Sequence, residues 1–317
     1  MKKRTMLKTI VMAAGSMMLI GSAAAQTEQD AIMMNKNQLC GGFMYNHGSW
    51  KDYWEGTLKR ENLNLGTVTA QSMMFMANYG ITDNLNIMAG APYVWTHASA
   101  GTLHGMKGIQ DVSVTLKWRA LNFKFANNDK LAVYAMGGIS TPLDNYVIDF
   151  LPLSIGLGST NLTGRVMVDY LHNRFFATAW GSYIFRSNVK IDRDAYYDEE
   201  LHNSNEVKMP DQVNLQLRTG YRGRYLIAEA LLTQLCTLGG FDITRNNMPF
   251  PSNQMNSTVA GINFKYTLKQ LTNISLLAGA NYTIHGRNVG QTTAFNGGVF
   301  YAFYTKKSSR KPTNNLQ

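Results

Sequence analysis

Seven charged side chains interrupt segments that are otherwise apolar or small, and these residues offer the clearest chemistry in the chain. Within each segment they occupy every second position, so they share one side of an extended chain. A set dominated by lysine and arginine could attract anionic solutes, or its two carboxylates could pair with the arginines as a bracing network. We favour the bracing network. The seven residues are Lys117, Arg119, Arg165, Asp169, Arg218, Glu229 and Lys265.

His97 and Ser99 form a His-x-Ser-x-Gly pattern with Gly101, similar to that of outer-membrane phospholipase A. In such a site a histidine acts as the base toward a serine, and a third polar residue orients the imidazole. Here the residue after the serine is Ala100, where the asparagine of that enzyme would stand. We therefore expect that the protein is not an enzyme, and we predict no catalytic residue.

The segment 186–209 is the most acidic part of the chain. A calcium loop would place acidic or amide residues at positions 192, 194 and 196, followed by glycine. Position 196 is a tyrosine, which makes a solvated surface loop the better interpretation. The sequence thus predicts no metal site and no cofactor.

The element that best shows how such side chains are positioned is a hairpin between Gly66 and Trp95. Two runs of alternating apolar and small or polar residues flank the turn Gly80 to Asn84, which is the pattern of paired strands. Strands of soluble proteins usually have about five or six residues. Longer runs that end in aromatic residues, here Tyr93 and Trp95, are typical of tilted strands that cross a bilayer.

The same alternation recurs along the chain and predicts an all-β fold, a transmembrane up-and-down antiparallel β-barrel of about 12 strands. The predicted turns and loops alternate between short and long, which a β-sandwich would not be expected to show. The seven charged side chains should face the lumen, because a lysine or arginine facing lipid costs about 2–4 kcal/mol at the midplane. The predicted strands cover residues 39–47, 66–79, 85–95, 111–121, 130–140, 161–171, 175–185, 212–221, 225–236, 257–268, 273–285 and 291–304.

The two ends of the chain have their own composition. A basic start, an apolar run and Ala23-Ala24-Ala25 predict a signal peptide, residues 1–25, cleaved after Ala25. We expect residues 26–37 to be a periplasmic N-terminal lead, residues 38–304 the barrel, and residues 305–317 a polar, basic tail. The formal net charge is +10, and four of these positive charges lie in the signal peptide. The remaining lysines and arginines are scattered, so we predict no nucleic-acid partner.

Cys40 and Cys236 lie far apart, in different predicted strands. Two cysteines do not make a disulfide framework, although an exported pair can be oxidised. We expect both thiols to be free and packed in the barrel wall. No segment after the signal peptide reaches 18 uninterrupted apolar residues, which argues against helical membrane spans.

Several of these segments resemble the phenol meta-pathway degradation family, whose members are often called simply transporters. The resemblance lies in the turn Tyr79-Gly80-Ile81-Thr82-Asp83-Asn84-Leu85, the strand end Ala91-Pro92-Tyr93, the stretch Gly108-Ile109-Gln110-Asp111-Val112 with its strand to Trp118-Arg119, and the phrase from Leu151 to Ser159. It implies a small outer-membrane barrel that admits hydrophobic or aromatic compounds. The chain departs from such barrels in its polar tail, since they usually finish on an aromatic residue.

The loop 141–160 is unusually apolar for a loop, and contiguous apolar patches normally mark binding sites or contacts. One hypothesis is that it folds against the barrel mouth or into the lumen as a hydrophobic access loop. The alternative is that it lengthens the adjacent strands in the lipid. The residues concerned are Phe150, Leu151, Leu153, Ile155 and Leu157.

Together these features predict a channel or transporter in the outer membrane of a Gram-negative cell, for passive passage of small, hydrophobic or aromatic solutes. The alternatives are a structural or adhesive barrel without a pore and, less favoured, a lipolytic enzyme in the barrel. The expected partners are outer-membrane lipid, a small-molecule solute and, during biogenesis, the barrel-assembly machinery. The solute, its direction of movement and the oligomeric state are left open.

Overall fold

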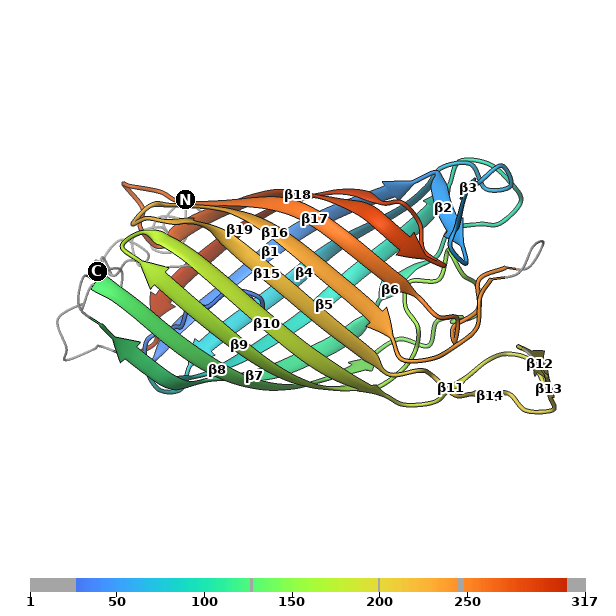
Figure 1. Cartoon of the computed structure of the whole chain (residues 1–317), viewed down its shortest axis with the longest axis horizontal. Coiled ribbons are helices and arrows are strands. Elements are labelled where there is room, and N and C mark those ends of the chain that lie inside the picture. Colours follow the sequence, from blue (N-terminus) through green and yellow to red (C-terminus); the bar gives the residue numbers. More distant parts are fainter. Residues whose placement is uncertain (1–26, 126–127, 199, 244–247, 307–317) are drawn as a thin grey trace, which may run out of the picture.

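Twelve long strands form the wall of a closed antiparallel barrel in the computed structural model (Figure 1). The structure describes residues 27–125, 128–198, 200–243 and 248–306, so the predicted signal peptide and nearly all of the predicted tail lie outside the described residues. The wall strands are β1 (Gln38–Trp50), β4 (Val68–Gly80), β5 (Leu85–Ala98), β7 (Asp111–Lys124), β8 (Asp129–Pro142), β9 (Asn161–His172), β10 (Phe175–Arg186), β15 (Gln212–Arg222), β16 (Leu226–Thr237), β17 (Asn256–Thr267), β18 (Ile274–Arg287) and β19 (Thr293–Tyr304).

The barrel closes where the first strand meets the last. β1 pairs with β4 on one side and with β19 on the other, so that Phe43 lies opposite Phe75 and Val299. Each of the other wall strands pairs with the wall strand that precedes it in the sequence and with the wall strand that follows it. This order confirms the predicted up-and-down barrel of about 12 strands.

Alternation along each strand separates an outer apolar surface from an inner polar one. On β7, Val114, Leu116 and Trp118 are exposed on the outside, while Thr115 and Lys117 are buried inside. A soluble protein would bury most of these apolar side chains, whereas a barrel in a bilayer turns them to the lipid. The burial pattern is therefore that of a membrane barrel.

Exposed aromatic side chains gather toward the two ends of the wall. Tyr45 and Tyr93 both lie close to Trp95, with ring centroids 6.2 and 6.1 Å from it, toward the long-loop end. Toward the opposite end, which carries the short turns and is here called the turn end, the Phe175 ring meets Tyr221 edge-on at 5.9 Å. Aromatic residues at both ends of an apolar band are typical of membrane barrels, where they sit at the lipid–water interfaces.

Many predicted strand ends differ from the observed ones by one to three residues, and two of these differences have a clear structural origin. The strand predicted over residues 111–121 continues to Lys124, because a bulge between Arg119 and Leu121 shifts the register and keeps Leu121 and Phe123 on the outer surface. Arg222, predicted as part of a turn, is the last residue of β15 and turns its side chain into the barrel.

The pairing of β5 changes along its length. Its first half pairs with β7 from Leu85 to Gly90, and its second half pairs with the short strand β6 (Lys107–Ile109). Pro92 has no backbone N–H and interrupts the ladder between the two halves, although its carbonyl accepts a bond from the Gln110 N–H at 2.9 Å. β6 and β7 therefore act as one interrupted strand beside β5.

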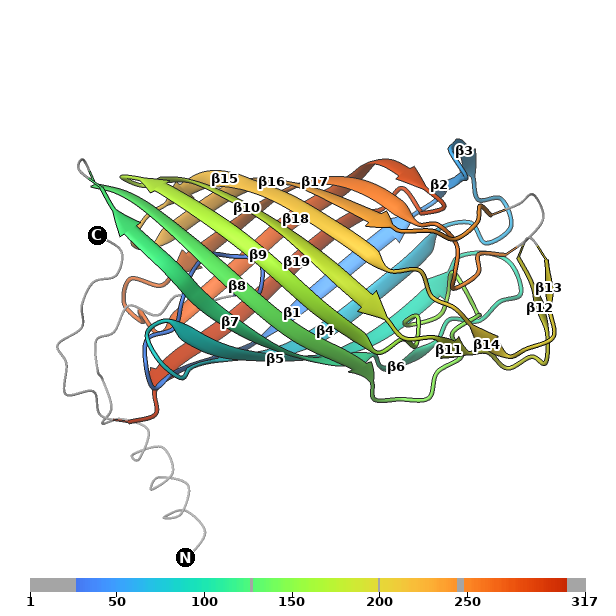
Figure 2. The same ribbon diagram turned by 60° about the horizontal axis from the view of Figure 1, so that its bottom comes forward.

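The long connections carry three strand pairs beyond the wall. β2 (Asp52–Glu55) and β3 (Leu58–Glu61) form one small hairpin. β11 (Val189–Lys190) pairs with β14 (Glu206–Val207), and between them β12 (Tyr196–Tyr197) pairs with β13 (Leu201–His202), so that these four strands form a second hairpin. All three pairs lie at the same end of the barrel, opposite the short turns (Figure 2). Among the described residues, no helix has the length and apolar character needed to cross a membrane.

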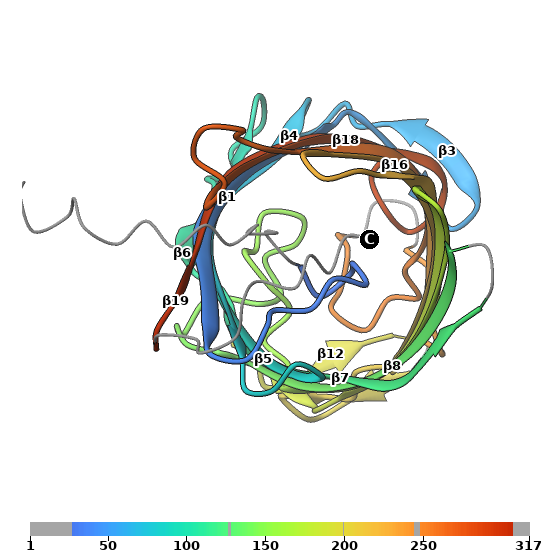
Figure 3. The ribbon, with the colours of Figure 1, turned by 90° about the vertical axis from the view of Figure 1, so that its left-hand side faces the viewer.

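Residues 27–37, here called the N-terminal segment, differ in place from the predicted periplasmic lead. They lie inside the barrel, as the view along its axis shows (Figure 3). The backbone enters at the turn end, where the Asn37 N–H donates to Gly80 O at 2.8 Å and Asn37 O accepts from the Thr305 N–H at 2.9 Å. Charged and polar side chains of the wall hold it there, a feature that its own polar sequence does not reveal.

The seam between β1 and β19 depends on a glycine. A Cβ at Gly42 would lie 2.3 Å from Val299 O and 2.8 Å from the Phe300 Cα, distances that no rotamer change can relieve. We expect Gly42→Ala to destabilise the barrel by about 1–3 kcal/mol or more through overpacking. The heat-modifiable electrophoretic shift of the folded barrel should weaken or disappear.

Gly41→Ala is the matched control, because its Cβ would meet nothing nearer than Met76 O at 3.7 Å. It should fold like the original chain. Equal behaviour of the two variants would contradict the tight seam.

Candidate functional site

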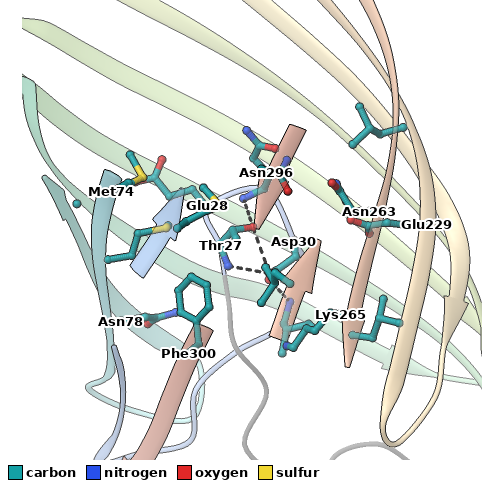
Figure 4. A pocket seen from close by; sticks show the side chains of 18 of the residues that line it. Thr27, Glu28, Asp30, Met74, Asn78, Glu229, Asn263, Lys265, Asn296 and Phe300 are labelled. Atoms are coloured by element: carbon teal, nitrogen blue, oxygen red, sulfur yellow. Dashed lines mark hydrogen bonds between the residues drawn. The ribbon is translucent and has the colours of Figure 1, made fainter. Parts of the chain in front are cut away.

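A cavity of about 550 Å³ lies in the lumen. One side of it is rich in methionine and other apolar side chains, interspersed with asparagines such as Asn78 and Asn296, and methionine suits a site that accepts ligands of different shape. The other side is polar and charged, and the N-terminal segment reaches between them (Figure 4). The apolar side, here called the methionine wall, consists of Met44, Met74, Met76 and Met88 together with Phe300 and Leu277.

Arg218 and Glu229 form a buried ion pair between the neighbouring strands β15 and β16. Both side chains are less than a tenth exposed, and Asn263 Nδ2 donates a further bond to Glu229 Oε1 at 3.2 Å. Arg218 Nε and Nη1 have no hydrogen-bond partner within the described part of the chain. The carboxylate of Glu229 thus satisfies only part of the hydrogen-bonding capacity of the guanidinium group.

Arg222 and Asp169 form a second buried pair. The guanidinium Nη1 and Nη2 donate to the two Asp169 oxygens at 2.9 and 3.1 Å, and the Thr178 hydroxyl donates to Asp169 at 2.5 Å. The Arg222 guanidinium also stacks on the Phe176 ring, 4.2 Å from its centre. This bidentate, stacked geometry fixes Arg222 firmly in the wall.

Lys117 is fully buried and holds the N-terminal segment. Its ammonium group donates to the carbonyls of Asp30 and of Ile32, the latter at 3.0 Å, and lies 3.5 Å from Asp30 Oδ1. Next to it, the Tyr134 hydroxyl donates to Ala31 O at 2.7 Å. A buried charge needs partners of this kind, so segment and wall depend on one another.

Arg165 anchors the segment at a second point. Its Nη1 donates to Glu28 O at 2.9 Å, and its guanidinium lies over the Trp180 ring at 4.2 Å. The Thr115 hydroxyl donates to Glu28 Oε1 at 2.8 Å. The strands β7 and β9, which lie on either side of β8, thus both contact the segment, and Tyr134 of β8 binds it as well.

Lys265 and Arg119 complete the set predicted from the sequence, at different places. Lys265 is buried on β17 and lines the cavity. Arg119 lies at the turn end, where its guanidinium donates to Asn84 Oδ1 at 2.6 Å and to Asp83 O at 3.0 Å. The structure therefore brings six of the seven residues into the lumen and assigns Arg119 to holding a turn.

The apolar loop, residues 143–160 and here called the mouth loop, folds inward over the lumen (Figure 3). Leu153 and Ile155 are buried, and Thr96 of β5 donates its hydroxyl to Leu153 O at 2.6 Å. Phe150, Leu151 and Leu157 are half-buried, and Leu157 packs against a cluster formed with two other loops. The loop thus narrows the mouth, and most of its apolar side chains are packed, although Leu143 and Val147 are exposed.

Tyr146 fastens the mouth loop to the barrel. Its hydroxyl donates to Asp111 Oδ1 at 2.8 Å and accepts a bond from the Gly158 N–H at 3.0 Å. Burial, together with the hydrogen bond to Asp111, raises the pKa of Tyr146. The hydroxyl therefore stays protonated and able to donate at physiological pH.

Tyr146→Phe should loosen this loop, because removing the hydroxyl leaves a carboxylate and an N–H without their partner at a cost of about 1–3 kcal/mol. Limited proteolysis of the folded protein should then cut within residues 143–160 faster than in the original. Tyr197→Phe is the control, since Tyr197 is 66% exposed. An unchanged cleavage rate for Tyr146→Phe would contradict the anchoring role.

His97 and Ser99 do not form a nucleophile and base. Both side chains are exposed, and the Ser99 hydroxyl oxygen accepts a bond from the Thr67 N–H at 2.8 Å. No hydrogen bond joins the two side chains within the described residues. A serine nucleophile needs its base within hydrogen-bond reach, so this geometry gives no support to the lipolytic alternative.

Sequence reasoning missed four groups of the lumen. Glu28 and Asp30 belong to a segment that has no strand pattern, and Arg222 stands beside a Gly-containing turn, so nothing local to them indicated the lumen. Tyr134 is on the inner face of β8, where its alternation with the half-buried Val133 and Ala135 of the outer face could have indicated it. Cys40 is buried on β1 and Cys236 half-buried on β16, and no disulfide joins them among the described residues.

Comparison with known proteins shows the fold. The COG4313 outer membrane channel from Pseudomonas putida F1 has a TM-score of 0.67 and 14% identity, covering 89% of this chain and 100% of that chain. The KdgM porin is less similar, with a TM-score of 0.43 and 8% identity over 83% of this chain and 99% of that one. No family model matches the sequence, and no curated protein matches it. The resemblance to the phenol meta-pathway degradation family therefore stays a prediction.

Proposed function

We propose that this protein is an outer-membrane channel through which small, apolar or aromatic solutes pass without chemical change. The observation that carries the proposal is the lumen cavity, with its methionine wall inside a closed barrel. A purely structural barrel has no need of an apolar surface facing its own interior. Methionine side chains, being flexible and polarisable, suit solutes that differ in shape.

The orientation follows from the ends of the chain. β1 begins and β19 ends at the turn end, where Asn37 bonds to Gly80 and Thr305, and we assign this end to the periplasm, so the mouth loop and the small hairpins face outward. A solute would pass the mouth loop first and then meet the methionine wall. The partners of the protein would be the surrounding lipid and the solute itself, with the barrel-assembly machinery involved only during biogenesis.

A non-conducting structural barrel is the second candidate. It is favoured by one observation, the N-terminal segment that occupies part of the lumen and is bonded to three strands of the wall. If the segment never leaves, the lumen stays obstructed. The two candidates therefore differ in a property that can be measured.

Uptake of an apolar fluorescent probe by cells that produce the protein tests the proposal. Cells with the channel should accumulate the probe several-fold faster than cells with an empty vector, and the protein purified from them should conduct ions in planar bilayers. Deleting residues 147–157 should change the uptake rate, because this part of the mouth loop covers the lumen. Equal uptake with and without the protein, and no ion current, would instead establish the structural barrel.

A further inference from the structure

The middle of the lumen wall has more positive than negative charge. Five cationic side chains reach it, and only two carboxylates of the wall accompany them, which leaves an excess of three positive charges. Two of the cations are paired within the wall, Arg218 with Glu229 and Arg222 with Asp169. The five cations are Lys117, Arg165, Arg218, Arg222 and Lys265.

The N-terminal segment supplies two negative charges that offset most of this excess. Asp30 lies against Lys117, and its charge also interacts with those of Lys265 and Arg218. Glu28 lies beside Thr115 and interacts with the charge of Arg165. Two carboxylates from outside the wall thus occupy a site built by cations of the wall.

Asp30 is presented to this site by a compact turn of its own segment. Its Oδ2 accepts bonds from the Thr27 N–H at 2.7 Å and the Thr27 hydroxyl at 3.2 Å, and its Oδ1 accepts from the Ile32 N–H at 3.0 Å (Figure 4). These bonds fix the carboxylate in one orientation beside the cavity. The carboxylate of a dissolved solute could contact the same cations without such a turn.

Two buried hydrogen-bond donors of Arg218 are not used by the described part of the chain. Arg218 is buried and lines the cavity, yet its Nε and Nη1 have no partner within the described part of the chain. Buried guanidinium donors are costly to leave unpaired, and a carboxylate is their best-matched acceptor. The methionine wall lies across the same cavity and offers an apolar surface for the rest of such a ligand.

We infer that this part of the lumen is a binding site for small carboxylates with an apolar or aromatic body, and that Asp30 occupies it as an internal stand-in for the carboxylate. The inference rests on the proposed channel function and narrows its solute class. A solute of this kind binds with its carboxylate toward Lys117 and Arg218 and its apolar body against the methionine wall, in competition with the N-terminal segment. The segment is thereby displaced by the solutes that the channel admits.

Calorimetric binding to the full-length protein in detergent tests the carboxylate class, with phenylacetate and the uncharged phenylacetamide as a matched pair. Phenylacetate should bind about tenfold more tightly, a difference typical of a charge-assisted hydrogen bond. Asp30→Asn removes the competing charge and should strengthen phenylacetate binding several-fold while leaving phenylacetamide unchanged. Lys117→Met and, should that variant fail to fold, Lys265→Met should abolish the preference for the carboxylate.

Asp52→Asn is the control, because it makes the same chemical change on the outer hairpin, where Asp52 pairs with the exposed Lys59. Equal affinity for phenylacetate and phenylacetamide would overturn the carboxylate site. An Asp30→Asn variant that binds phenylacetate no better than the original would overturn the competition. Binding is measured without transport, so a protein that binds as expected but lets nothing pass would refute the channel and leave the site standing.

Discussion

Removing residues 26–35 is expected to raise the single-channel conductance several-fold. The described part of this stretch lies inside the barrel and contributes no strand to it, so the wall should close without it. Its loss widens the path and leaves Lys117 and Arg165 facing water, with the wall's excess positive charge no longer balanced by Glu28 and Asp30. The open channel should therefore also become more selective for anions.

Planar-bilayer recordings at low and high salt check both effects, since screening should reduce the anion selectivity but not the conductance ratio. Gln29→Ala changes an exposed side chain of the same segment and should behave like the original protein. Unchanged conductance after the truncation would show that the main barrier to ions is elsewhere, at the mouth loop.

Asp169→Ala is expected to cost about 3–5 kcal/mol of stability, because it leaves the buried Arg222 guanidinium without its carboxylate. The Thr178 hydroxyl loses its acceptor in the same variant. Equilibrium unfolding in detergent should show the loss. The double variant with Arg222→Met should regain most of it, since the uncompensated charge is then gone.

Asp52→Ala is the matched surface control. Asp52 pairs with Lys59 in water, both side chains are more than two-fifths exposed, and such pairs contribute about 0–1 kcal/mol. A similar loss for Asp169→Ala and Asp52→Ala would mean that the lumen is wet enough to screen its charges, and that the interior network does not brace the wall.

The sequence predicts most of the barrel because a strand between lipid and water must alternate. On β10, Phe175, Tyr183 and Phe185 are exposed to the outside, while Phe176 and Trp180 are buried in the lumen, as the twofold pattern requires. The tight turn around Asn173, with its φ of 55°, marks where one strand ends and the next begins. The predicted strand ends differ from the observed ones where a bulge or an inward-turning terminal side chain interrupts the pattern, as at Leu121 and Arg222.

The lumen itself is less predictable, because the partners of its charges come from parts of the chain that carry no periodic signal. The bracing interpretation holds in the structure for Arg218 and Arg222, which pair with wall carboxylates. It does not describe Lys117, whose carboxylate partner is Asp30 of the N-terminal segment. Only the three-dimensional path of residues 27–37 reveals this, since a polar stretch ahead of the first strand has the same composition whether it lies in solvent or inside a barrel.

The inward course of this segment has a practical consequence for labelling. Because Thr27 lines the cavity, a tag or dye joined directly ahead of it would begin inside the cylinder and compete with the Asp30 contacts. The exposed Leu58 of the β2–β3 hairpin, which lies beyond the wall strands, is the better place for an epitope. Antibody access to a tag at each position on intact cells would also report which end of the barrel faces the medium.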